Sequence, residues 1–152
     1  MPTLLVQSCS KSKSETDDPI PAIDLYAGYF YKIIKKAIRE DDIDPDLDIC
    51  ILSAKHGLID PDTRLNQYDQ KMDVGRAKEI RKDVRNDLIQ RINSGTYSEV
   101  LINMGGPYRE AIQGFESEVS VPVETIDGRL GERGRQLKHR IRQSSTTSVL
   151  AD

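Results

Sequence analysis

Three short segments of the sequence gather residues that can bind anions or move protons, and each follows an apolar run. The first, residues 9–14, carries a thiol, three hydroxyl groups and two ammonium groups. Such groups can hold a phosphate or a carboxylate, so Ser10, Lys11 and Ser12 are candidate ligand-binding residues. Cys9 is a candidate catalytic nucleophile, because a nearby ammonium group favours the thiolate. The alternatives are a flexible polar loop and a small residue at a strand end.

The second segment, residues 53–57, places the imidazole of His56 directly after the ammonium group of Lys55. The positive charge of the lysine should lower the imidazole pKa. A neutral histidine can act as an acid, a base or a hydrogen-bond donor, so both residues are candidate catalytic residues. The alternative is an ordinary surface histidine. Ser53 and Gly57, at the two ends of the segment, are candidate ligand-binding residues.

Carboxylates follow in the same polar stretch. Asp60 is a candidate catalytic residue, since it could orient water or a sugar hydroxyl, but Asp-Pro-Asp is also ordinary turn chemistry. Asp69, next to Tyr68, offers the same chemistry further along the chain. Tyr26 is a candidate for stacking on a ligand ring, although its place on an apolar stripe favours core packing.

The third segment, residues 105–108, reads Gly-Gly-Pro-Tyr. Gly105 and Gly106 would let a ligand approach the backbone closely, and Tyr108 lies beside them. Proline suits the first position of a helix, whose free N–H groups attract anions. The segment is neither GxGxxG nor a P-loop, so no dinucleotide or nucleoside triphosphate fingerprint is present. A plain tight turn is the alternative.

The elements that would position these segments alternate along the chain. Strands are predicted at residues 3–8, 48–53, 99–103 and 119–126; helices are predicted from an Asp24 N-cap to the acidic residues 40–42, from 74 to 92, after Pro107, and over the basic residues 129–142. Residues 54–72 are expected to be mainly irregular. Alternation of this kind predicts a three-layer α/β/α fold with a mainly parallel four-stranded sheet. Residues 1–143 are expected to form one domain and residues 144–152 a flexible tail.

Parallel strands would bring the three segments together. Ligands of such sheets bind at the carboxyl ends of the strands. Lys11, Lys55 and Gly106 each follow a predicted strand, so we expect them to share one rim of the sheet.

Charge and composition narrow the class of protein. The net charge is −3, yet residues 129–142 hold six basic residues against one acidic residue. This favours a phosphate-bearing partner, with a solvated helix face as the alternative; the candidate nucleic-acid backbone contacts are Arg133, Arg135, Lys138 and Arg140. No apolar run approaches the roughly 18 residues that span a bilayer, and no signal peptide is evident, so a cytoplasmic protein without membrane contact is expected. No CxxC pair occurs and the two histidines are far apart, so neither a metal nor a cofactor is expected.

Four motifs carry a resemblance to known proteins: C-S-K-x-K, D-L-Y, I-L-S-A-K-H-G-L-I-D-P and G-G-x-Y. Over residues 3–115 the chain resembles an uncharacterised bacterial and archaeal family grouped with the peroxide-stress protein YaaA. It is more remotely similar to uracil-DNA glycosylase-like domains, including one found in archaeosine-synthesis enzymes. That similarity implies a parallel sheet with a catalytic loop after the first strand, here residues 9–13. The G-Q-D-P-Y and H-P-S motifs are absent, so glycosylase activity is an analogy of fold.

Two functions follow as expectations. In the first, the protein is an enzyme acting on a nucleoside or nucleobase, free or within DNA or RNA, by glycosidic-bond cleavage or base modification. Lys11 and Lys55 would hold phosphate or stabilise a leaving base, His56 would donate a hydrogen bond, and Asp60 or Asp24 would position water. In the second, it is a non-catalytic module that binds nucleic acid or protects against oxidative stress. The acidic body, the aromatic content of 5% and the absence of tryptophan speak against the second function.

Overall fold

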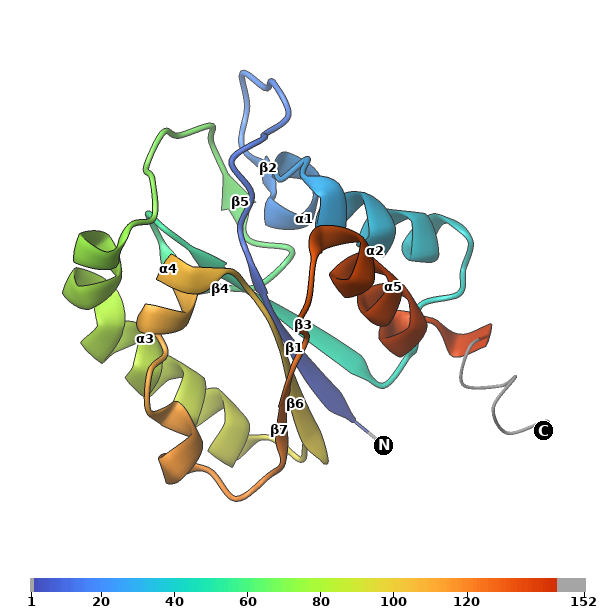
Figure 1. Cartoon of the computed structure of the whole chain (residues 1–152). Coiled ribbons are helices and arrows are strands. Elements are labelled where there is room, and N and C mark those ends of the chain that lie inside the picture. Colours follow the sequence, from blue (N-terminus) through green and yellow to red (C-terminus); the bar gives the residue numbers. More distant parts are fainter. Residues whose placement is uncertain (1, 145–152) are drawn as a thin grey trace.

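The centre of the protein is a five-stranded sheet with the strand order β4-β3-β1-β6-β7. The computed structural model describes residues 2–144 and is shown in Figure 1. The strands of the sheet are β1 (Thr3–Ser8), β3 (Leu47–Ser53), β4 (Gly57–Ile59), β6 (Glu99–Asn103) and β7 (Val123–Thr125). All pairings are parallel except that of β3 with β4. The predicted α/β class and mainly parallel sheet are therefore confirmed.

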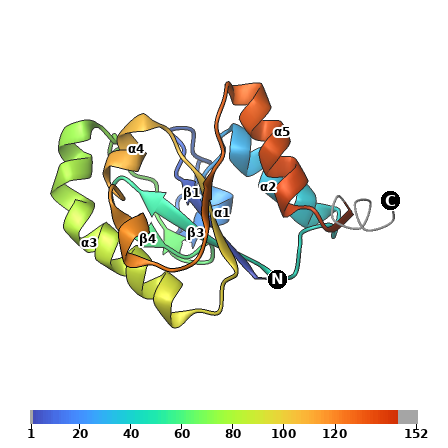
Figure 2. The same cartoon turned by 60° about the horizontal axis from the view of Figure 1, so that its bottom comes forward.

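Helices cover both faces of this sheet, as Figure 2 shows. They are α1 (Ala22–Leu25), α2 (Tyr29–Arg39), α3 (Val74–Ser94), α4 (Gly106–Glu110), the short 3₁₀ helix η1 (Phe115–Glu118) and α5 (Leu130–Ile141). Apolar side chains of α3, α4 and η1 pack with alternate residues of the central strands on one face. Residues of α2 and α5 pack with the intervening strand residues on the other. Because successive side chains of a strand point to opposite faces of the sheet, each central strand contributes to two hydrophobic cores.

Residues 54–72 contain strands that the sequence did not predict. Gly57–Ile59 folds back as β4 against β3, with Ile59 opposite Ile51. Gly57 has φ +75°, a conformation that glycine adopts without a steric penalty, and this permits the tight turn. The very short strands β2 (Ile20–Pro21) and β5 (Arg64–Leu65) pair with each other. Strands of two or three residues are too short to show an alternating pattern.

The first predicted helix is split in two. Asp24 does not cap it but lies inside α1, and the chain is extended at Tyr26 before α2 begins. The cause is a close contact with the segment that follows β1: Ser10 Oγ accepts a hydrogen bond from the backbone N–H of Gly28, at 3.2 Å. A Cβ atom at Gly28 would lie 2.7 Å from that of Ser10, so only glycine fits. The contact fixes the course of the first polar loop.

The C-terminal region differs in detail from the prediction. Of residues 119–126, only 123–125 form a strand, and this strand lies at the sheet edge, as Pro122 indicated. Ser144, the first residue of the predicted tail, donates a backbone hydrogen bond of 2.8 Å to Asp42. Residues 145–152 lie outside the described part of the chain. Among the helices of residues 2–144, none is long and apolar enough to cross a membrane.

Truncating the apolar side of α3 should cost substantial stability. Leu88 is fully buried in the core between α3 and the sheet. We expect Leu88→Ala to lower the free energy of unfolding by about 2–5 kcal/mol, because it removes buried methyl groups and leaves a cavity. Val74→Ala, on the same helix but 47% exposed, should change it by less than about 0.5 kcal/mol. Urea denaturation measures both, and equal losses would contradict this packing.

Candidate functional site

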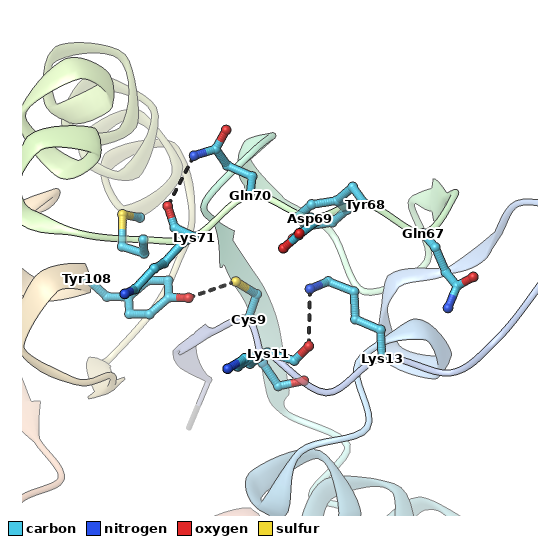
Figure 3. Close-up of a pocket in the computed structure, with 11 residues that line it drawn as sticks. Cys9, Lys11, Lys13, Gln67, Tyr68, Asp69, Gln70, Lys71 and Tyr108 are labelled. Atoms are coloured by element: carbon cyan, nitrogen blue, oxygen red, sulfur yellow. Dashed lines mark hydrogen bonds between the residues drawn. The ribbon is translucent and has the colours of Figure 1, made fainter.

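A cavity of about 760 Å³ opens at the carboxyl ends of the parallel strands. Figure 3 shows its lining residues: Cys9, Ser10, Lys11, Lys13, Gln67, Tyr68, Asp69, Gln70, Lys71, Met72 and Tyr108. The first four follow β1, Tyr108 comes from α4 after β6, and the others form the segment between β5 and α3. The volume suits a small-molecule ligand.

The predicted rim is formed in part. Cys9, Ser10, Lys11 and Tyr108 lie together at the cavity, as we expected for candidate site residues. Ser12, Gly105 and Gly106 do not line it. The larger omission is residues 67–72, which provide more than half of the lining. Their polar, irregular sequence marked a long loop, but a sequence pattern does not show which way such a loop folds.

Tyr68 anchors this loop above the strand ends. Its hydroxyl lies 2.5 Å from the Tyr26 hydroxyl and 2.9 Å from Ser53 Oγ. Tyr26 and Ser53 are both fully buried, and Ser53 Oγ also accepts the backbone N–H groups of Lys55 and His56. Burial raises the pKa of Tyr68, so the phenol stays neutral and keeps its proton for these contacts. Tyr26 is therefore a core residue that orients Tyr68, not a stacking platform.

Ammonium groups surround the Tyr68 ring. Lys13 Nζ lies 4.5 Å from its centroid and Lys55 Nζ lies 5.6 Å away, both within cation–π range. The cavity lining holds three ammonium groups, those of Lys11, Lys13 and Lys71, against one carboxylate, that of Asp69. The excess of positive charge in a partly enclosed space favours an anionic ligand.

Cys9 faces the cavity from the end of β1. It is 9% exposed, and its Sγ lies 3.1 Å from the Tyr108 hydroxyl. Burial raises the pKa of Tyr108, so this hydroxyl is neutral and can donate to the sulfur. The second thiol, Cys50, is fully buried, and burial raises its pKa to about 12. Of the two thiols, Cys9 alone is placed for chemistry.

His56 and Lys55 lie on the outer side of Tyr68. The imidazole meets the Tyr68 ring edge to face, with centroids 5.1 Å apart. Its pKa is lowered by burial and by the Lys55 charge, so the predicted direction is confirmed, with burial as the larger cause. Both side chains are exposed and neither lines the cavity. The structure thus places them as neighbours of the site.

Asp60 does not reach the site. Its carboxylate pairs with the Arg91 guanidinium at 2.8 Å. It lines a separate cavity of about 460 Å³, beside Asp48 and Asp62. The antiparallel strand β4 carries the chain away from the rim, so Asp60 does not line the Cys9 cavity, where we expected it. Gly57 likewise forms the start of β4 rather than a ligand contact. The carboxylate at the cavity is Asp69.

Two of the four predicted nucleic-acid contacts on α5 are engaged within the protein. Arg140 pairs with Glu99 and Glu124. Arg133 donates two hydrogen bonds to Asn103 Oδ1, at 2.9 and 3.2 Å. Arg135 and Lys138 are exposed. The basic sequence of α5 therefore overstates the charge that the helix offers to an extended polyanion. In residues 2–144, no group of three His, Cys, Asp or Glu side chains is placed to hold a metal ion.

Comparison with known proteins places the chain in a family and confirms its fold. The profile of a family of unknown function (DUF6884) matches residues 4–139. The fold is similar to the crystal structure of AF0587, a protein of unknown function, with a TM-score of 0.58 and 15% sequence identity. The match covers 91% of this chain and 44% of the AF0587 chain, and at this identity it shows the fold alone. None of the curated proteins matches the chain.

The environment of His56 can be tested by titration. We expect its pKa to lie below 6.5, because burial and the Lys55 charge both disfavour the imidazolium ion. Below the unfolded-state value the unfolded chain binds the extra proton, so the stability due to this group is lost as the pH falls. Lys55→Met should raise the pKa only in part, since burial remains. NMR titration of the ring measures both, and a wild-type pKa above 6.5 would refute this environment.

Proposed function

The chain belongs to the DUF6884 family, whose function is unknown, and we propose that it is an enzyme acting on a nucleotide, by cleavage of the N-glycosidic bond or by modification of the base. One observation carries the proposal. A cavity of about 760 Å³ joins three lysines, one carboxylate, one thiol and two tyrosines at the carboxyl edge of a parallel sheet. Each part of a nucleotide has a chemical counterpart in this set.

The phosphate group would bind among the lysines. Lys11, Lys13 and Lys71 line the cavity, and Figure 3 shows them coming from two separate segments. Lys13 Nζ also donates to the backbone carbonyl of Lys11 at 3.4 Å, which holds the Lys13 side chain against the loop after β1. Ammonium groups on flexible stems can converge on one phosphate from several directions.

The base would lie against aromatic and amide groups. Tyr68 and Tyr108 stand on opposite sides of Cys9 in Figure 3 and offer ring faces and edges to a planar ligand. Gln67 and Gln70 add carboxamides, which both donate and accept hydrogen bonds, as base edges require. Aromatic and amide groups in one cavity with the lysines favour a nucleotide over a simple phosphate ester.

Asp69 is the group best placed to promote cleavage. A carboxylate can orient water and stabilise the positive charge that develops on the sugar as a glycosidic bond breaks. The water oxygen bonds to C1′ of the sugar and the C1′–N bond breaks. The base nitrogen takes that electron pair and one proton, so the products are a sugar phosphate and the free base. Base modification would instead use the Cys9 thiol, which lies beside the Tyr108 hydroxyl.

The second candidate function, a non-catalytic nucleic-acid-binding module, rests on exposed Arg135 and Lys138 of α5. It is the weaker of the two, because Arg140 already pairs with two glutamates of this chain. The resemblance to YaaA and to glycosylase-like domains is compatible with either function and does not choose between them.

Removing the carboxylate of Asp69 should abolish most of the activity. With ribo- and deoxyribonucleoside monophosphates as substrates, we expect Asp69→Asn to lower kcat on the order of 100-fold, a usual loss for such a group, with a smaller change in KM. Chromatography of the released base measures the rate. Asp62→Asn, the same change at an exposed aspartate outside the cavity, is the matched control. Equal rates for Asp69→Asn and wild type would exclude this role.

Removing one ammonium group should weaken nucleotide binding. We expect Lys71→Gln to raise the Kd for a nucleoside monophosphate about tenfold, the usual size of a charge-assisted hydrogen bond, and to reduce its dependence on salt. Lys78→Gln, on the exposed side of α3, is the control and should leave Kd unchanged. Isothermal titration calorimetry at two salt concentrations measures both variants. If nucleotides do not bind, or if the two variants weaken binding equally, the cavity is not the nucleotide site.

A further inference from the structure

Two buried amide side chains lie at the carboxyl ends of β1 and β6, outside the lining of the Cys9 cavity. Gln7 is 1% exposed and Asn103 is fully buried. They occupy adjacent strands in register, and Asn103 Nδ2 donates to Gln7 Oε1 at 2.8 Å. Buried amides are costly unless they are hydrogen-bonded. Here the pair is partnered, and it leaves the Asn103 carbonyl oxygen free to accept from another element.

That oxygen holds the guanidinium group of Arg133. Nη2 and Nε of Arg133 donate to Asn103 Oδ1 at 2.9 and 3.2 Å. The guanidinium also lies over the Phe30 ring of α2, 4.7 Å from the centroid. These contacts order Arg133 before a ligand binds. Binding therefore does not have to restrict this long, flexible side chain, which would cost free energy.

The charge of Arg133 is not cancelled by these contacts. An amide oxygen satisfies N–H donors but carries no net charge. Within residues 2–144, Arg133 has no carboxylate within ion-pair distance, whereas Arg109 has one and Arg140 and Arg142 have two each. Burial lowers the pKa of Arg133 and the neighbouring Arg109 guanidinium lowers it further, while the Asp127 carboxylate, which pairs with Arg109, offsets part of this effect. A fixed, partly buried cation beside a second cation is an arrangement that an anion stabilises.

The turn that follows Asn103 faces open space. Cβ atoms built on Gly105 and Gly106 would meet no heavy atom within 4 Å, so this backbone faces open space. The turn comes two residues after Asn103, and Arg109 extends from the helix that the turn begins, donating to the Met104 carbonyl and to Asp127. Arg133 is itself only partly buried, so a small anion can reach its guanidinium group from the solvent.

We propose that Arg133, held by Asn103 and Phe30, anchors a second anion site that binds a phosphate group. Guanidinium groups match phosphate oxygens in geometry and charge. None of Gln7, Asn103 or Arg133 lines the Cys9 cavity, so the site does not depend on the proposed function. The phosphate is either a free phosphate monoester or inorganic ion, or a phosphodiester of a nucleic acid strand.

The test follows two resonances by NMR during titration with inorganic phosphate: Arg133 Nε–Hε, and the Asn103 Nδ2–Hδ2 amide, which contacts Arg133 in the wild type and is still present in Arg133→Gln. We expect a saturable shift in the wild type and in Lys71→Gln, whose change lies in the other cavity. Arg133→Gln should weaken phosphate binding at this site at least tenfold. Arg135→Gln, the same loss of charge on the exposed side of the same helix, should weaken it less than twofold. A stationary resonance at 10 mM phosphate, or equal losses in the two variants, would overturn the proposal.

A second variant separates charge from structure. Asn103→Asp would place a carboxylate on Arg133 and cancel its charge while keeping the contact. We expect it to weaken phosphate binding as much as Arg133→Gln does; undiminished binding in a folded Asn103→Asp protein would contradict the proposal. Titration with a short single-stranded oligonucleotide then identifies the source of the phosphate. A larger effect of Arg133→Gln on the oligonucleotide than on inorganic phosphate assigns the site to a nucleic acid backbone, and the reverse assigns it to a free phosphate.

Discussion

Parallel pairing of β1 with both of its neighbours is the constraint on which the site depends. Val6 lies opposite Cys50 on one side and Ile102 on the other, so three strands end at the same level. Their carboxyl ends then deliver three loops to one edge of the sheet. Antiparallel pairing would send alternate loops to opposite edges. The cavity exists because this parallel pairing brings the loops after β1 and β6 to the same edge of the sheet.

The polar residues that end these strands determine what lies above them. Ser53, Gln7 and Asn103 are almost completely buried at the ends of β3, β1 and β6. Each would cost free energy there without a hydrogen-bond partner. Ser53 is partnered by Tyr68, and Asn103 by Gln7 and Arg133. One requirement, the satisfaction of buried polar groups, thus fixes both the loop over the Cys9 cavity and the cation of the second site.

The sequence predicted what depends on local pattern. Apolar runs and helical periodicity located the central strands and α3, and the parallel order followed from their alternation. Cys9, Lys11 and Tyr108 were therefore expected at one rim, where they lie. The sequence did not predict two non-local hydrogen bonds. The one between Ser10 and Gly28 splits the first helix, and the one between Tyr68 and Ser53 folds the loop inward. These partners are 18 and 15 positions apart, and at least one residue of each pair lies in a loop. The hydrophobic periodicity of helices and strands does not predict such contacts.

The basic residues of α5 are likewise visible in the sequence, but their contacts are not. The basic run of α5 is plain in the sequence, but its cations have different surroundings once the helix packs on the sheet. Arg140 meets two glutamates of neighbouring strands, and its charge is compensated within the fold. Arg133 meets an amide, which fixes its position and leaves its charge. Only a cation of the second kind can attract a ligand strongly, because binding then replaces water rather than an existing ion pair. The partner of each arginine, and not the number of arginines, therefore determines where α5 can bind an anion.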